Sequence, residues 1–191
     1  MKSETTILVL VFTALLSCDS IASAQSGMSI RNQLGGIEFD DRQDLIRMGD
    51  KAFPAFEIIL NDPEAKVGEI IRILGLLSDV EADRSRFLEH AVRRTADPIP
   101  QIRSRAAKLL GKIGTIAEAS PLVALLSDPD VVVVNFAATA LAEIGGPREL
   151  VAMDVWLQGT THIVHSSLYD KVKMRRTELV ERLARRPLPK K

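Results

Sequence analysis

The sequence predicts an all-α fold, an array of stacked helical repeats, and three observations support this. A segment of the chain is repeated, signals for the start and the end of a helix stand in each copy, and aromatic residues make up only 4% of the chain. Small aliphatic side chains suit closely stacked helices, whereas the strands of a β-sandwich favour aromatic residues. A fixed period with helix signals at both ends is typical of a helical repeat array.

The repeat runs from Asp97 to Gly114 and recurs 31 residues later, with seven of its eighteen positions identical. In each copy we expect the first aspartate to cap the helix N-terminus, the next proline to occupy the first turn, and the last glycine to end the helix. These residues are Asp97 and Asp128, Pro98 and Pro129, and Gly114 and Gly145.

The other elements follow from helical periodicity. Residues 25–40 lack a sustained period and are predicted to be a flexible linker. The helical array is expected over 41–186, followed by a basic tail at 187–191. After one or two turns at 41–48, its helices are predicted near 51–60, 66–77, 84–95, 102–113, 120–126, 131–144, 148–157 and 167–186, which makes about four antiparallel pairs.

The helix at 131–144 needs its own justification because it opens with the run VVVVNF. β-branched residues favour strands, so this run alone would predict one. The repeat register aligns it with the helix at 102–113, and we therefore expect a helix.

The first 24 residues are predicted to be a signal peptide. Lys2 precedes an apolar stretch of ten residues at 7–16, and Ala22 and Ala24 form a small-residue cleavage signal. The apolar stretch is shorter than the roughly 20 residues that span a bilayer. We expect a mature chain that starts at Gln25 and is exported to the periplasm or the extracellular space.

The single cysteine leaves an alternative open. Leu15-Leu16-Ser17-Cys18 resembles the lipobox of bacterial lipoproteins, in which Cys18 would become the acylated first residue. Leu16 is a less usual residue at its position, and the site after Ala24 fits better. In either case the mature chain offers no thiol for disulfides, metal binding or nucleophilic chemistry.

The stretch from Ile102 to Gly114 (IRSRAAKLLGKIG) resembles the short HEAT-like repeat of phycobilisome lyase subunits and many other bacterial proteins. In that pattern an aliphatic–Arg pair opens the second helix of each pair (helix B), and an Ala-Ala pair packs on the first (helix A). Leu-Gly-x-Ile-Gly then closes helix B. The resemblance is strong over 97–145, weaker over 50–78, and extends over 147–186 only by continuation.

The resemblance implies a right-handed α-solenoid whose B helices line a concave, protein-binding face, and it implies no catalysis as a rule. The aliphatic–Arg pair occurs once, at Ile102-Arg103, and the chain departs from the pattern in the next copy, where the counterpart is Val133-Val134. Because phycobilisomes are cytoplasmic and this chain opens with an export signal, we do not expect lyase activity.

The first candidate site is the exposed edge of the B helices. Arg103 and Arg105 on the helix at 102–113 align with the apolar residues Val134 and Phe136 in the next copy. Exposed apolar groups flanked by charge often mark interaction sites. Alternatively, the C-terminal helix covers these residues and they belong to a thicker core. The candidates are Arg103, Arg105, Lys108, Lys112, Val134, Phe136 and Thr139.

The second candidate is a basic patch on the C-terminal helix. It would attract anionic lipid head groups or an acidic partner. Alternatively, this helix is the polar cap that a repeat array needs, with cations that complement its macrodipole. The residues are Lys171, Lys173, Arg175, Arg176, Arg182, Arg185 and Arg186.

Other chemistry is weakly represented. His162 and His165 could share a metal, but zinc needs at least a third protein ligand. No Ser-His-Asp arrangement and no phosphate-binding glycine loop can be identified, and the formal net charge is zero, which does not favour nucleic acid as a partner. We expect no cofactor, no metal, no small-molecule substrate and no enzymatic activity.

The predicted function is therefore a non-catalytic scaffold or adaptor of the exported compartment that binds an unidentified protein through its B-helix face. The alternative is a membrane-anchored lipoprotein, acylated at Cys18, whose basic C-terminal helix contacts the membrane surface.

Overall fold

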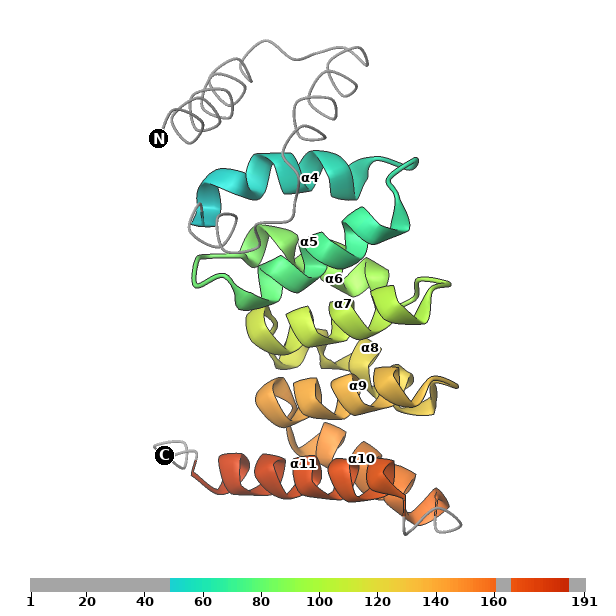
Figure 1. Ribbon diagram of the computed structural model, residues 1–191. Helices are drawn as coiled ribbons and strands as arrows, with labels where there is room; N and C mark the ends of the chain where they lie inside the picture. The colour runs from blue at the N-terminus through green and yellow to red at the C-terminus, as the bar shows by residue number, and fades with distance from the viewer. Residues whose placement is uncertain (1–48, 161–165, 186–191) are drawn as a thin grey trace, which may run out of the picture. The chain divides into compact units, whose positions relative to one another are not determined.

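The computed structural model describes residues 49–160 and 166–185, and every regular element within these ranges is helical (Figure 1). The prediction of an all-α fold of stacked helices is confirmed. The described residues form two compact units. The smaller contains 49–65 and 80–82, and the larger contains 66–79 and the described residues from 83 onward.

The smaller unit consists mainly of a 3-10 helix, η2 (Gly49–Ala52), followed by α4 (Phe53–Asn61). Pro54 stands in the first turn of α4, as expected, where its missing N–H costs no hydrogen bond. One side of α4 is buried at the spacing that the sequence predicts. The buried side chains are Phe53, Phe56, Ile59 and Leu60.

The larger unit is a double layer of helices (Figure 1). Its B helices lie side by side in one layer: α5 (Val67–Asp79), α7 (Pro100–Ile113), α9 (Val131–Ile144) and α11 (Ser167–Ala184). The A helices form the second layer: α6 (Leu88–Arg94), α8 (Ala119–Ala124) and α10 (Pro147–Gly159). The short 3-10 helices η3 (Ser85–Phe87), η4 (Ile116–Glu118) and η5 (Leu125–Ser127) flank α6 and α8.

The valine-rich run VVVVNF is helical and forms the start of α9. Asp130 caps this helix, because its carboxylate accepts the N–H groups of Val132 and Val133 at 2.7 and 3.3 Å. Burial of Val133 and Val134 against neighbouring elements offsets the weak helix propensity of β-branched residues. The repeat register was therefore a better guide than local propensity.

The prediction places the capping residue of each repeat helix wrongly. Asp97 and Asp128 do not cap α7 and α9, because each lies two residues before the cap position, which Ile99 and Asp130 occupy. Oδ1 of each aspartate instead accepts the backbone N–H of that cap residue at 2.9 Å, which makes an Asx turn.

The first-turn prolines were misplaced in the same way. Pro98 and Pro129 precede the helices, and in α7 the proline of the first turn is Pro100.

The final glycines end the helices as predicted, but for a different physical reason. Gly114 and Gly145 have φ values of −80° and −62°, so neither needs the left-handed conformation that often follows a helix. A Cβ atom at these positions would lie 2.7 and 2.5 Å from the carbonyl oxygens of Leu110 and Leu141. Glycine fits at this repeat position because any side chain would collide with a carbonyl oxygen of the last helical turn.

The B helices α7 and α9 approach each other closely at Gly111. A Cβ atom there would lie 2.9 Å from both Cα and Cβ of Ala140. The four alanines of the Ala-Ala pairs are fully buried, in agreement with their expected role of letting helices pack closely. These are Ala106, Ala107, Ala137 and Ala138.

We predict opposite effects for alanine at two glycines of the B helices. Gly111→Ala should lower the free energy of unfolding by about 1–3 kcal/mol, because the backbone of Ala140 leaves no room for a methyl group. Gly75→Ala in α5 should raise it by about 0.5–1 kcal/mol through helix propensity. There the new Cβ would meet only Nη1 of Arg105, at 4.0 Å. Urea unfolding of both variants checks this, and equal effects would contradict the α7–α9 packing.

Candidate functional site

Arg103 links two successive repeats. Its Nε donates to Oδ2 of Asp128 at 2.7 Å and its Nη2 donates to Oδ1 at 2.8 Å, while Nη1 donates to the carbonyl oxygens of Asp97 and Pro98. The side chains of Arg103 and Asp128 are only 13% and 5% exposed. The expectation that Arg103 lies exposed at the edge of α7 is therefore wrong, and its role is to hold the turn before α7 to the turn before α9.

This pairing changes the ionisation of both groups. The hydrogen bond from Arg103 lowers the pKa of Asp128 below its ordinary value, although burial acts in the opposite direction. The same hydrogen bond raises the pKa of Arg103, which remains a cation. The bidentate geometry is the one in which guanidinium and carboxylate interact most strongly.

Val134 belongs to the core rather than to the surface. It is 3% exposed, and its helix, α9, packs beside α11 in the B layer. For this residue the thicker-core interpretation holds. The strongly exposed valines of α9 are Val131 and Val132, at 62% and 51%. Alignment of the two repeat copies could have indicated these valines, because they stand at the positions of Pro100 and Gln101, the first residues of α7.

The two lysines among the candidates each lie near an acidic residue, but the two contacts differ in distance and in solvent exposure. Nζ of Lys108 lies 3.0 Å from Oδ1 of Asp79 at the end of α5, and both side chains are about one quarter exposed. Nζ of Lys112 lies 3.9 Å from Oε1 of Glu143 on α9, and both are about half exposed. The second contact is long and solvated, so it adds little stability.

Arg105 differs from the other three cations of α7. Its side chain is half-buried, and Nη1 lies 4.0 Å from the position that a Cβ of Gly75 would take on the neighbouring helix α5. It makes no ion pair or hydrogen bond with any residue in the part of the chain that the structure describes.

Phe136 and Thr139 on α9 are also half-buried, and they stand one repeat period after Arg105 and Lys108. Because the Lys112–Glu143 contact joins residues one period apart, the same register sets Phe136 and Thr139 on the helix beside Arg105 and Lys108. Thr139 donates its hydroxyl to the carbonyl oxygen of Asn135. We call Arg105, Lys108, Lys112, Phe136 and Thr139 the B-helix face.

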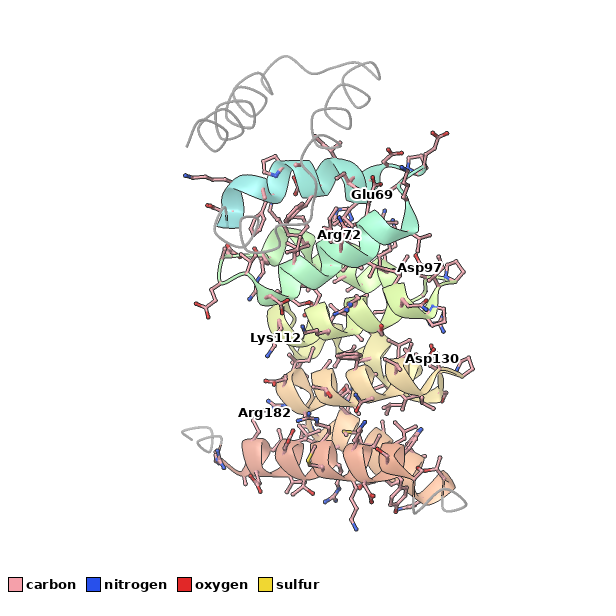
Figure 2. All side chains as sticks on the ribbon, viewed as in Figure 1. Glu69, Arg72, Asp97, Lys112, Asp130 and Arg182 are labelled. Atoms are coloured by element: carbon pink, nitrogen blue, oxygen red, sulfur yellow. The ribbon has the colours of Figure 1, made fainter. Side chains whose placement is uncertain are left out.

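Most arginines of the predicted basic patch are engaged within the protein. Arg176 makes a salt bridge of 2.8 Å with Asp154, which ties α11 to α10, and Arg175 pairs with Glu178 at 2.8 Å. Arg182 belongs to α11, and its side chain reaches toward α9 (Figure 2). There it donates to the carbonyl oxygens of Ala142 and Gly145. A cation in this position satisfies terminal carbonyl groups and complements the dipole of α9.

The exposed cations of α11 are fewer than the sequence suggests. Lys171 and Lys173 are exposed, and Arg185 is exposed but lies 3.4 Å from Glu181. Arg186 lies outside the described residues. With Val172 and Leu179 buried and a polar outer side, α11 has the features of a capping helix.

Three further residues singled out by the sequence, Cys18, His162 and His165, also lie outside the described residues. Within 49–160 and 166–185, no cluster of three or more His, Cys, Asp and Glu side chains is suited to holding a metal ion. Over the same ranges no helix combines the length and the apolar character needed to cross a membrane.

Comparison with known proteins identifies part of the chain. Residues 87–162 match the family of HEAT repeats, so this part of the chain, which includes α6 to α10, contains HEAT repeats. No curated protein and no solved structure matches the chain.

We predict that Asp128→Asn lowers the free energy of unfolding at pH 7 by about 3 kcal/mol, because it leaves the guanidinium of Arg103 buried without its counter-charge. Asn keeps an oxygen for the N–H of Asp130, but an amide NH2 replaces the Oδ2 that accepts Nε of Arg103, so the variant removes the charge and one hydrogen bond of the pair. Because the folded pKa of Asp128 is lowered, its contribution is complete above the unfolded pKa of about 3.9 and is lost as the pH falls through the folded pKa.

The difference between the wild type and the variant should therefore be constant above about pH 5 and shrink below pH 4. Denaturant unfolding at a series of pH values measures it. Glu143→Gln is the matched control, since it removes a carboxylate from a solvated contact and should change stability by less than about 1 kcal/mol. A difference for Asp128→Asn that does not depend on pH would refute the pairing.

Proposed function

We propose that the protein is a non-catalytic scaffold that binds a protein partner through its B-helix face. The observation that carries the proposal is the HEAT-repeat match over residues 87–162. Stacked repeats of this kind present an extended surface assembled from equivalent positions of successive helices, which is suited to binding another protein.

The arrangement of side chains on α7 and α9 supports the choice of face. The B-helix face combines cations with a half-buried aromatic ring and a hydroxyl on two adjacent helices. Aromatic and arginine side chains are enriched at protein–protein interfaces, where they supply most of the binding energy. The basic side of α11 is a weaker candidate, because three of its arginines already serve internal contacts.

We further propose that the protein acts after export, so that its partner is a protein of the periplasm or of the extracellular space. Support for this comes from the N-terminal sequence, in which Lys2, the apolar stretch at 7–16 and the residues Ala22 and Ala24 follow the signal-peptide pattern. Few cations of α11 remain available for a lipid surface, which makes the diffusible form the preferred one.

Site-specific photo-crosslinking tests the proposed face. A benzophenone amino acid in place of Thr139 should crosslink a partner protein in extracts of the exported fraction. The same amino acid in place of Arg148, an exposed residue at the start of α10 in the other layer, should not. Equal crosslinking from both positions, or none from Thr139, would show that the B-helix face is not the binding surface.

The intact mass of the mature protein tests the proposed compartment. We expect a chain that starts at Gln25 in the soluble exported fraction. An acylated chain that starts at Cys18 in the membrane fraction would replace this proposal with the lipoprotein alternative, and an unprocessed chain would overturn both.

A further inference from the structure

We propose that Arg105 is the residue of the B-helix face that binds a carboxylate group, and that the partner contacts it with an acidic protein segment. This inference rests on the proposed function and specifies the chemistry of the partner at one position.

The first support is the charge balance of α7. The helix carries four basic residues and no acidic one. Three of the cations find an acid outside the helix: Arg103 pairs with Asp128, Lys108 with Asp79, and Lys112 with Glu143. Arg105 makes no such pair within the described residues. Arg105 is therefore the cation of α7 that has no acidic partner among the described residues, and its guanidinium remains available to a carboxylate. Lys112 is only loosely paired, because its Nζ lies 3.9 Å from Glu143.

The second support is what lies beside Arg105 on the adjacent helices. On α5, Nη1 of Arg105 lies 4.0 Å from the position that a Cβ of Gly75 would take, and Gly75 has no side chain. Glu69, earlier in α5, accepts the backbone N–H of Lys66 at the start of its own helix, and Asp79 pairs with Lys108. On α9 the corresponding position is Phe136. Neither neighbour brings a carboxylate to the guanidinium, and an acidic ligand would supply it.

The chemistry of this position favours an acidic protein segment over other anions. A guanidinium binds one planar carboxylate with two parallel hydrogen bonds. The ring of Phe136 on the adjacent helix suits an apolar side chain next to that carboxylate. A lipid surface or a nucleic acid would require several available cations, whereas Lys108, one helical turn after Arg105, is already paired with Asp79 at 3.0 Å.

Binding of a defined peptide tests the inference. The probe is a short fluorescein-labelled peptide in which glutamate alternates with leucine and serine, titrated by fluorescence anisotropy with the wild-type protein. Arg105→Glu should weaken binding at least about tenfold, and Arg105→Gln should weaken it severalfold. Because Arg105 has no partner among the described residues, both variants should keep the helical content and melting temperature of the wild type.

The matched control is Arg148→Glu, which makes the same charge change on an exposed residue of α10 and should leave binding unchanged. A second control is the peptide with glutamine in place of glutamate, which should bind at least about tenfold more weakly. Equal binding of the two peptides, or equal binding by Arg105→Glu and the wild type, would overturn the inference. So would Arg105-dependent binding to vesicles containing phosphatidylglycerol without binding to the peptide.

The crosslinking experiment separates this inference from the proposed function. If Thr139 crosslinks a partner and Arg105→Glu does not reduce the yield, the face binds protein but not through a carboxylate at Arg105. If Thr139 crosslinks nothing, the proposed function itself fails.

Discussion

One largely buried ion pair, Arg103 with Asp128, sets how two successive repeats meet. It joins the turn that precedes α7 to the turn that precedes α9, because the same guanidinium also binds the carbonyl oxygens of Asp97 and Pro98. Both turns are Asx turns closed by an aspartate at the same repeat position. The pair therefore fixes the distance between equivalent points of neighbouring repeats, and the apolar contacts along α7 and α9 form within that spacing. Close contacts such as the one between Gly111 and Ala140 tolerate little variation in it.

The repeat sequence was sufficient to predict the fold of the region it covers. The period located α7 and α9 and overrode the strand propensity of the valine run, because burial of Val133 and Val134 outweighs the propensity of single residues. The cap of each helix was misplaced by two residues. An aspartate followed by proline is compatible with a helix cap and with an Asx turn before the helix, and the two differ only in which N–H the carboxylate accepts.

The candidate sites were less predictable because partners distant in sequence decide which charges are available. Arg103 and Arg105 look alike in the sequence, but Asp128 engages the first, whereas the second makes no ion pair with any described residue. Arg182 looked like part of a basic patch, but its nearest acceptors are backbone carbonyl oxygens at the end of α9. Periodicity shows which side of a helix is buried, and it carries no information on which charges meet across helices.

The charges of α7 also bear on how such an array can evolve. Three of its four cations pair with acids of the flanking segments: Lys108 with Asp79 at the end of α5, Arg103 with Asp128 in the turn before α9, and Lys112 with Glu143 on α9. A second copy of α7 inserted beside the first would set four cations next to four cations, whereas a copy of α9 carries a single acid within the helix. The units are therefore not interchangeable modules. Lengthening this array by tandem duplication requires compensating changes of charge. A repeat can therefore be added only where its neighbours supply the opposite charges.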